Sequence, residues 1–317
     1  MNLTKHSVDI VVPIYNDEQV IDRLCETVFS VLGDKFKSIK LILVDDGSKD
    51  QSFAKAIENR KLNQNIEVIR LAGNFGQHRA ILAGLRSTKS PFVAIMDSDL
   101  QDRPRDIPVL LQKMLEEDTP MAIARRSKRS DSFLKKMGSK MFAKVSNILV
   151  PFKVDPNVGA FRVIRQTVVS EVCNVDEHTG TPFSMLYSLQ IPYSIVDLER
   201  DARTDGVSGY TLRKSLKLAG DRIMTYSIKP IRLAILLGVF FGMTSIGIAV
   251  YSIVNYGLQD KVYPGWTSTV FVTSFFGGLN LLFLGIIGEY IGRIYIEARG
   301  IPNYMIRYST IDELEED

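Results

Sequence analysis

The first hundred residues alternate between short apolar runs and longer segments in which apolar residues recur at helical spacing. The apolar runs are rich in β-branched residues, which is typical of parallel strands buried on both faces. They predict four strands, at Val8–Ile14, Leu41–Val44, Glu67–Leu71 and Phe92–Met96. Helices are predicted at Gln19–Leu32 and Gly76–Arg86. This alternation predicts an α/β fold with a doubly wound, mostly parallel sheet.

Polar residues directly follow three of the predicted strands. In doubly wound sheets, ligands bind beyond the carboxyl ends of the strands. The segments at those ends are Tyr15–Glu18, Asp45–Ser48 and Asp97–Asp99. We therefore expect their side chains to meet at one edge of the sheet, and this is the first indication of a binding site.

Two long apolar runs lie towards the C-terminus. The run Ile231–Val254 has no charge after Arg232, and the run Val270–Ile287 has no charge at all. About 20 apolar residues are enough for a helix to cross a hydrocarbon core of roughly 30 Å. We therefore predict two transmembrane helices, with a pair of buried core helices as the alternative. Small residues suit close helix packing in lipid, and here they are Gly238, Gly242, Gly247, Gly277, Gly278 and Gly285.

The basic residues predict the orientation of these two helices. Lysines and arginines precede the first run and follow the second, whereas the connecting loop at 255–268 has Lys261 alone. The positive-inside rule then places both termini in the cytosol, with a multi-pass anchor in the inner (plasma) membrane. The polar N-terminal residues lack an apolar signal segment, in agreement with this orientation. Glu289 and Arg293 have the spacing of an ion pair on a helix, and a role of Glu289 in lipid-phosphate chemistry is the alternative.

Two further stretches, Ser132–Phe152 and Tyr210–Tyr226, combine apolar residues at helical spacing with several lysines and arginines. Helices of this kind lie on anionic lipid surfaces. We predict amphipathic interfacial helices here, with ordinary surface helices packed on the sheet as the alternative.

Composition adds little to this picture. The formal net charge of +3 is mild and gives no indication of a nucleic-acid partner. The two cysteines, Cys25 and Cys173, lack the spacing of metal ligands and are expected to be reduced thiols.

The triplet Asp97–Asp99 is the main candidate for chemistry. An Asp-x-Asp triplet alone is a weak signal, but here it follows a buried strand and precedes Leu100 and Gln101. Mg²⁺ takes one or two carboxylates as ligands and completes its shell with phosphates. Two aspartates at alternate positions beyond a strand end can share that task. A metal there would offset the charge on a departing nucleoside diphosphate.

Five motifs together resemble a family of enzymes. They occur in order at Val11–Glu18, Val44–Ser48, Asn74–His78, Asp97–Asp102 and Gly288–Tyr295, and Pro302–Tyr304 follows them. This set resembles family-2 glycosyltransferases with the GT-A fold, of the branch that transfers sugars to polyprenyl phosphates. The resemblance covers nearly the whole chain. The predicted domains are a cytosolic GT-A catalytic domain at 1–228, a transmembrane hairpin at 229–294 and a cytosolic tail at 295–317.

The resemblance implies a nucleotide-sugar donor site with a divalent metal. The residues that it assigns to the nucleoside are Pro13, Tyr15, Glu18 and Asp46. The residues that it assigns to Mg²⁺ or Mn²⁺ are Asp97, Asp99 and Gln101. A UDP-sugar is the preferred donor, and a GDP-sugar is the alternative.

The resemblance also implies contacts to phosphate groups and to the acceptor lipid. Arg126 and Arg129 match a basic segment near phosphates, with solvated surface charge as the alternative. Arg203 and Ser208 match a segment on the acceptor side. An arginine at position 203 would hold the lipid phosphate through paired hydrogen bonds.

One position departs from the family pattern. Many relatives carry an acid directly before Phe-Arg, where this chain has Ala160. A polyprenyl phosphate is already anionic and can attack without a strong base, or Asp155 can help to position it. Either route implies an inverting displacement that depends mainly on positioning and electrostatics.

Three other interpretations of the sequence stay open. A processive polysaccharide synthase shares the aspartate motifs but usually has more spans and a Gln-x-x-Arg-Trp motif, and Trp266 lies between the two spans. A non-catalytic or engineered-inactive protein of the same fold is kept open by Ala160. A nucleotide-binding transport accessory lacks support, because no Walker A pattern is present. The small residues of the spans make a homo-oligomer an additional expectation.

Overall fold

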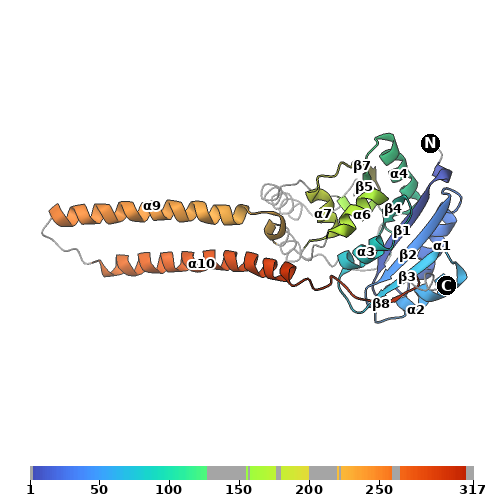
Figure 1. The fold of residues 1–317 in the computed structure, drawn as a ribbon, viewed down its shortest axis with the longest axis horizontal. Coiled ribbons are helices and arrows are strands. Elements are labelled where there is room, and N and C mark those ends of the chain that lie inside the picture. The colour runs from blue at the N-terminus through green and yellow to red at the C-terminus, as the bar shows by residue number, and fades with distance from the viewer. Residues whose placement is uncertain are drawn as a thin grey trace. The chain divides into compact units, whose positions relative to one another are not determined.

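The computed structural model describes residues 3–126, 155, 158–175, 180–199, 220, 223–258 and 265–311. In these residues, eight strands form one sheet in the order β7-β5-β6-β4-β1-β2-β3-β8 (Figure 1). The strands are β1 (Ser7–Ile14), β2 (Ser38–Asp45), β3 (Ile66–Leu71), β4 (Phe92–Ile95), β5 (Met121–Arg126), β6 (Val158–Arg165), β7 (Ser194–Leu198) and β8 (Ile306–Ser309). The predicted strands are confirmed as β1 to β4, with small shifts at their ends.

The described helices include both helices predicted in the first hundred residues, which are α1 and α3. The α-helices are α1 (Ile21–Leu32), α2 (Ser52–Leu62), α3 (Gln77–Arg86), α4 (Ile107–Glu116), α6 (Gln166–Asn174), α7 (Pro182–Ser188), α9 (Lys229–Leu258) and α10 (Trp266–Ala298). Two short 3₁₀ turns are η1 (Leu3–Lys5) and η2 (Pro104–Asp106).

The centre of the sheet is parallel and its margins are mixed. Strand β1 pairs in parallel with both β2 and β4, and β2 pairs in parallel with β3. Strand β6 runs antiparallel between β4 and β5, and β7 is parallel to β5. The prediction of an α/β fold with a mostly parallel sheet is confirmed.

Helices cover both faces of the sheet, so the central strands are buried on both sides. Val8, Ile10 and Val12 of β1 are fully buried in a cluster with residues of α1 and α4. On the other face, α3 approaches β1 at Gly84, where an added Cβ would lie 2.4 Å from Cγ1 of Val11. This close approach explains a glycine inside α3, where glycine otherwise weakens a helix.

The chain divides into two compact units, one with the sheet and residues 301–311, the other with α9 and α10. Both long helices are exposed, and each contains a stretch apolar enough to cross a membrane, at Lys229–Ile248 and Ser268–Ala298. Aromatic contacts join them, with the ring of Phe241 5.6 Å from that of Phe275. The predicted pair of long apolar helices is confirmed, and membrane insertion stays a proposal.

A set of polar contacts holds the end of α10 to the segment that precedes α9. The Tyr290 hydroxyl donates to the carbonyl of Ser227, and Arg293 Nη1 donates to Thr225 Oγ1 at 2.8 Å. Arg293 also pairs with Glu289 at 2.8 Å, so the predicted i,i+4 ion pair is confirmed. The predicted amphipathic stretch Ser132–Phe152 lies outside the described residues, as does most of Tyr210–Tyr226.

The predicted tail at 295–317 includes the last turn of a helix and one strand. Helix α10 continues to Ala298, and β8 then adds to the edge of the sheet, antiparallel to β3. Behind this strand, the N–H of Thr310 donates to the carbonyl of Val68, and the Thr310 hydroxyl accepts from the N–H of Val68 and donates to the buried Glu67. Lys40 and Arg60 lie 3.6 and 3.5 Å from the Glu67 carboxylate. Residues 301–311 are therefore part of the sheet unit.

We predict that Thr310→Val destabilises the sheet unit by about 1–3 kcal/mol, because it leaves the buried Glu67 carboxylate without one donor. Thr310→Ser keeps the hydroxyl and should stay within about 0.5 kcal/mol of the wild type. Urea unfolding of the detergent-solubilised protein, followed by circular dichroism, measures both. An equal loss in the two variants would show that the hydroxyl has no such role.

Candidate active site

The loop after β1 is joined to the loop after β2 by hydrogen bonds in both directions. Asn16 has a positive φ of 55°, which turns the chain sharply at the strand end. Its N–H donates to Ser48 Oγ at 3.0 Å, and its side-chain oxygen accepts from the N–H of Lys49 at 2.9 Å. Glu18 accepts from the N–H of Gln51 at 2.9 Å. The two loops therefore form one rigid ledge at the carboxyl ends of β1 and β2.

Asp46 holds a third loop against this ledge. Its two carboxylate oxygens accept from the N–H groups of Phe75 and Gly76, at 2.7 and 2.8 Å. Burial raises the pKa of Asp46, while these hydrogen bonds act in the opposite direction. The side chain predicted to hold the nucleoside therefore anchors the segment that leads into α3.

The Asp-x-Asp turn lies directly beyond β4. Asp97 Oδ1 accepts from Nε2 of Gln77 at 2.7 Å, which ties the turn to the first residue of α3. Ser98 donates to Asp17 Oδ2 at 2.7 Å, which ties it to the loop after β1. Asp99 Oδ1 accepts from the N–H of Gln101 at 3.1 Å. The turn is therefore bonded to α3 and to the loop after β1.

Asp17 is the acid that connects the turn to the ledge. It accepts from the N–H of Tyr15 at 3.1 Å as well as from Ser98. Burial raises the pKa of Asp17, and repulsion by Asp50 and Asp99 acts in the same direction. A concentration of negative charge at this edge is the environment that a cation would relieve.

The donor set of the turn fits Mg²⁺ or Mn²⁺ that is shared with a diphosphate. Asp97 and Asp99 supply two hard carboxylate oxygens. The described part of the chain has no group of three or more His, Cys, Asp or Glu residues that could hold a metal, so phosphates and water would have to supply the other ligands. Mg²⁺ is commonly held by one or two carboxylates, with substrate phosphates and water as the other ligands. Gln101, the predicted third ligand, is 8% exposed.

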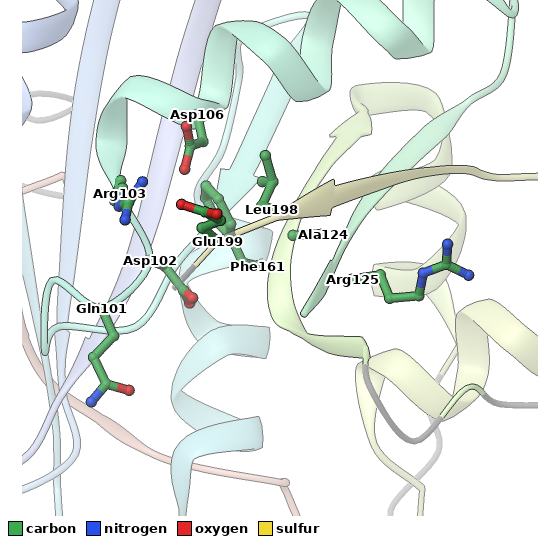
Figure 2. A pocket seen from close by; sticks show the side chains of 9 residues that line it. All are labelled: Gln101, Asp102, Arg103, Asp106, Ala124, Arg125, Phe161, Leu198 and Glu199. Carbon is green, nitrogen blue, oxygen red and sulfur yellow. The ribbon is translucent and has the colours of Figure 1, made fainter. Parts of the chain in front are cut away.

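A small pocket lies beside the turn, with about 250 Å³ of empty space that is partly open to solvent. Figure 2 shows Asp106 and Glu199 near its middle, whereas the side chains of Gln101 and Arg125 point away. The lining residues are Gln101, Asp102, Arg103, Asp106, Ala124, Arg125, Phe161, Leu198 and Glu199. The pocket is thus lined both by β6, through Phe161 next to Ala160, and by the segment after the turn, through Gln101.

The acid proposed to compensate for Ala160 lies next to an arginine. Asp155 Oδ2 is 3.8 Å from Nη1 of Arg125, and Arg125 binds Asp197 through two hydrogen bonds of 2.6 and 2.7 Å. Arg162 pairs with Ile95 across β6 and β4, and continuing this register by two residues leads to Ala160 and Asp97. The position of the missing acid is therefore on β6, two residues before the one that pairs with the last residue of β4.

Comparison with known proteins decides the family. Residues 9–173, more than half of the chain, match glycosyl transferase family 2. The chain is 32% identical over 302 residues to an uncharacterized glycosyltransferase of Bacillus subtilis, covering 95% of this chain and 93% of that protein. It is 31% identical over 303 residues to the bactoprenol glucosyl transferase of Shigella phage SfX, covering 95% and 98%. The chain belongs to glycosyltransferase family 2.

The family resemblance predicted from the motifs is thus confirmed, and the matched region of this glycosyltransferase contains the whole described ledge and turn. A solved structure of glucosyl-3-phosphoglycerate synthase from Mycobacterium tuberculosis, in complex with uridine diphosphate, is similar with a TM-score of 0.49. That similarity has 16% sequence identity and covers 69% of this chain and 78% of that chain.

The structure brings only some of the predicted site residues of this glycosyltransferase together. The loops that bear Tyr15, Glu18 and Asp46 meet at the same edge as the Asp97–Asp99 turn. Arg129, Arg203 and Ser208 lie outside the described residues. For Arg126 the structure describes the backbone, which pairs with Leu198. The functional roles of all these residues stay predictions.

The sequence analysis missed three residues that shape the site. Asp17, Gln77 and Ser98 each bond to the Asp-x-Asp turn or belong to it. Asp17 and Ser98 lie between residues to which a role was assigned, whereas Gln77 lies in a motif in which no residue had an assigned role. For Asp17 and Ser98 the signal was a polar residue next to a predicted ligand, but the pairing itself depends on contacts across many residues of sequence.

His78 makes the stability of this glycosyltransferase depend on pH. Burial, and next the charges of Arg162 and Arg79, lower the pKa of His78 from 6.5 to about 4. Between these values the unfolded chain binds the proton and the folded chain does not. Stability therefore falls as the pH falls from 6.5 towards 4.

We predict that His78 removes about 2 kcal/mol of stability between pH 7 and pH 5. Urea unfolding at both pH values, in the wild type and in His78→Phe, measures this contribution. The phenylalanine ring does not titrate, so the variant should lose about 2 kcal/mol less than the wild type over this range. Equal losses in the two proteins would contradict the prediction.

Proposed function

We propose that this glycosyltransferase transfers a sugar from a nucleotide-sugar, preferably UDP-linked, to a polyprenyl phosphate such as undecaprenyl phosphate. The proposal rests chiefly on the fixed turn at Asp97–Gln101, where two carboxylates stand at the carboxyl edge of the sheet. The acceptor class is supported by the similarity, over 95% of the chain, to a protein named bactoprenol glucosyl transferase. The two exposed apolar helices support a site at the cytosolic membrane face.

In the proposed reaction, residues of the ledge bind the donor. Tyr15 and Glu18 lie on the joined loops after β1 and β2 and, with Pro13 and Asp46, would border the nucleoside. Asp97 and Asp99 would hold Mg²⁺ or Mn²⁺, which when bound offsets the negative charge on the leaving diphosphate. Gln77 and Asp17 keep the turn in place through their hydrogen bonds. The chain therefore contributes mainly by positioning and electrostatics.

On the acceptor side, one oxygen of the lipid phosphate attacks the anomeric carbon. The new bond forms on the face opposite the bond to the diphosphate, which breaks as the nucleoside diphosphate leaves, so the anomeric centre inverts. The phosphate oxygen is already anionic, and no proton has to be removed from it. Arg203, Ser208, Arg126 and Arg129 are proposed to bind the phosphate groups.

The central test is Asp99→Asn in the full-length protein, with labelled nucleotide-sugars, Mn²⁺ and undecaprenyl phosphate. Loss of one carboxylate should lower formation of the labelled lipid by about 10²-fold or more. Asp118→Asn is the matched control, because Asp118 is an exposed acid whose partner is Arg165, at 3.0 Å. Mn²⁺-dependent binding of UDP, measured by calorimetry, should weaken in the first variant alone.

Two outcomes would contradict the proposal in different ways. Full activity of Asp99→Asn would refute the metal assignment while leaving the transferase intact. If no donor sugar gives a lipid product although the wild type binds nucleotide, the catalytic proposal fails and a non-catalytic role gains support.

A second variant tests the role proposed for Asp155. We predict that Asp155→Asn lowers kcat about tenfold, because the amide lacks the charge that attracts Arg125 and that is proposed to help position the acceptor. The KM for the donor should change less than about twofold, since Asp155 does not belong to the donor ledge. Steady-state kinetics at saturating lipid acceptor measure both constants. An unchanged kcat would show that Asp155 has no part in positioning the acceptor phosphate.

A further inference from the structure

Arg162 is a charged residue in the middle of the sheet. It lies on β6 and pairs with Ile95 of β4 on one side and with Ile123 of β5 on the other. The residue is 1% exposed and is one of the largest fully buried side chains. In the part of the chain that the structure describes, no carboxylate forms an ion pair with it. A buried charge without a counter-charge is expensive, so its role needs an explanation.

The guanidinium group binds the backbone at the start of its own strand. Nη2 donates to the carbonyl of Gly159 at 2.7 Å, and Nε donates to the carbonyl of Ala160 at 3.1 Å. These two residues precede Arg162 on β6. The planar fork of an arginine can make both bonds at once, whereas the ammonium group of a lysine has no such fixed geometry. Nη1 is buried and has no hydrogen-bond partner among the described residues.

One aromatic ring connects this arginine to α3. The guanidinium carbon lies 3.9 Å from the ring centre of Phe183, within the range of a cation–π contact. The ring of His78 meets the same phenylalanine edge to face, with 5.4 Å between ring centres. His78 follows Gln77, whose side chain donates to Asp97 Oδ1 at 2.7 Å. The contacts therefore run from Arg162 through Phe183 to the helix that holds Asp97.

We propose that Arg162 is a positioning residue for the Asp97 carboxylate. It acts through the aromatic contact to the first turn of α3, while its hydrogen bonds to Gly159 and Ala160 hold the guanidinium against the ring of Phe183. A leucine or methionine would fill the same space but could make neither set of contacts. This inference rests on the proposed function, because it assumes that Asp97 binds a metal and a diphosphate. Loss of such an outer contact typically weakens metal affinity 10–100-fold.

The test uses the full-length detergent-solubilised protein and Arg162→Lys, which keeps the charge and loses the fork. Arg165→Lys is the matched control, because Arg165 is on the same strand but forms an exposed ion pair with Asp118 at 3.0 Å. Calorimetry measures the Kd of UDP with Mn²⁺ and with a chelator, and kinetics give kcat and the KM for the donor. GDP replaces UDP if the wild type binds GDP alone.

We expect Arg162→Lys to weaken Mn²⁺-dependent nucleotide binding about tenfold and to lower kcat. Binding in the presence of chelator should stay within about twofold, and Arg165→Lys should match the wild type. A Kd with Mn²⁺ and a kcat both equal to those of the wild type would overturn the proposal. Equal weakening with and without Mn²⁺ would also overturn it, because that result indicates general loosening of the sheet.

If Arg162→Lys does not fold, Phe183→Leu provides a second test of the proposal. It keeps an apolar side chain in α7 but removes the ring between Arg162 and His78, so it should weaken Mn²⁺-dependent binding about threefold or more. Unchanged binding in this variant would refute the aromatic route and with it the proposal. Mn²⁺-dependent nucleotide binding by the wild type distinguishes a failure of this proposal from a failure of the proposed function. If the wild type shows no Mn²⁺-dependent nucleotide binding, the metal assignment itself is wrong.

Discussion

Parallel pairing of β1 with β2 on one side and with β4 on the other is the constraint on which the site depends. Ile14 pairs with Asp45, and Val11 pairs with Ile95, so three strands end at the same edge. The chain can leave that edge only through loops whose polar groups must find partners. They find them in one another, as the bonds from Asn16 to Ser48 and from Ser98 to Asp17 show. The same geometry that closes the core therefore assembles a rigid polar ledge.

Buried charges then determine how the surrounding elements are held. Asp45, fully buried, accepts from the N–H of Ser48 and pairs with Arg70 at 3.2 Å. Asp46 fixes the loop at Phe75 and Gly76, and Glu67 holds Thr310 behind the last strand. Each charge lies inside the protein with specific partners, because an unpartnered one would be too costly. These buried carboxylates thus fix the positions of the loops after β2 and before α3, and of Thr310 after β8, through specific hydrogen bonds.

The path of the chain after the sheet has a functional consequence. It forms two apolar helices and then returns, so that β8 pairs with β3 at the far edge from β7. The sheet unit is therefore closed by residues that follow the second long helix. For an enzyme proposed to join a water-soluble donor to a lipid, this arrangement links the fold of the catalytic unit to its anchor at both ends.

The sequence alone determined the strands β1 to β4, the polar edge and the two long helices, because each depends on a local pattern. Runs of β-branched residues predict buried strands, and length without charge predicts α9 and α10. Strand β8 has only four residues, two of them exposed, and so carries no such pattern. Other features depend on contacts between residues far apart in the chain. They are the bond between Gln77 and Asp97, the bonds of Asp46 to the loop before α3 and the contact of the buried Arg162 with Phe183. Only the tertiary structure could decide these, since the energy of burying a polar group depends on which partner the fold brings to it.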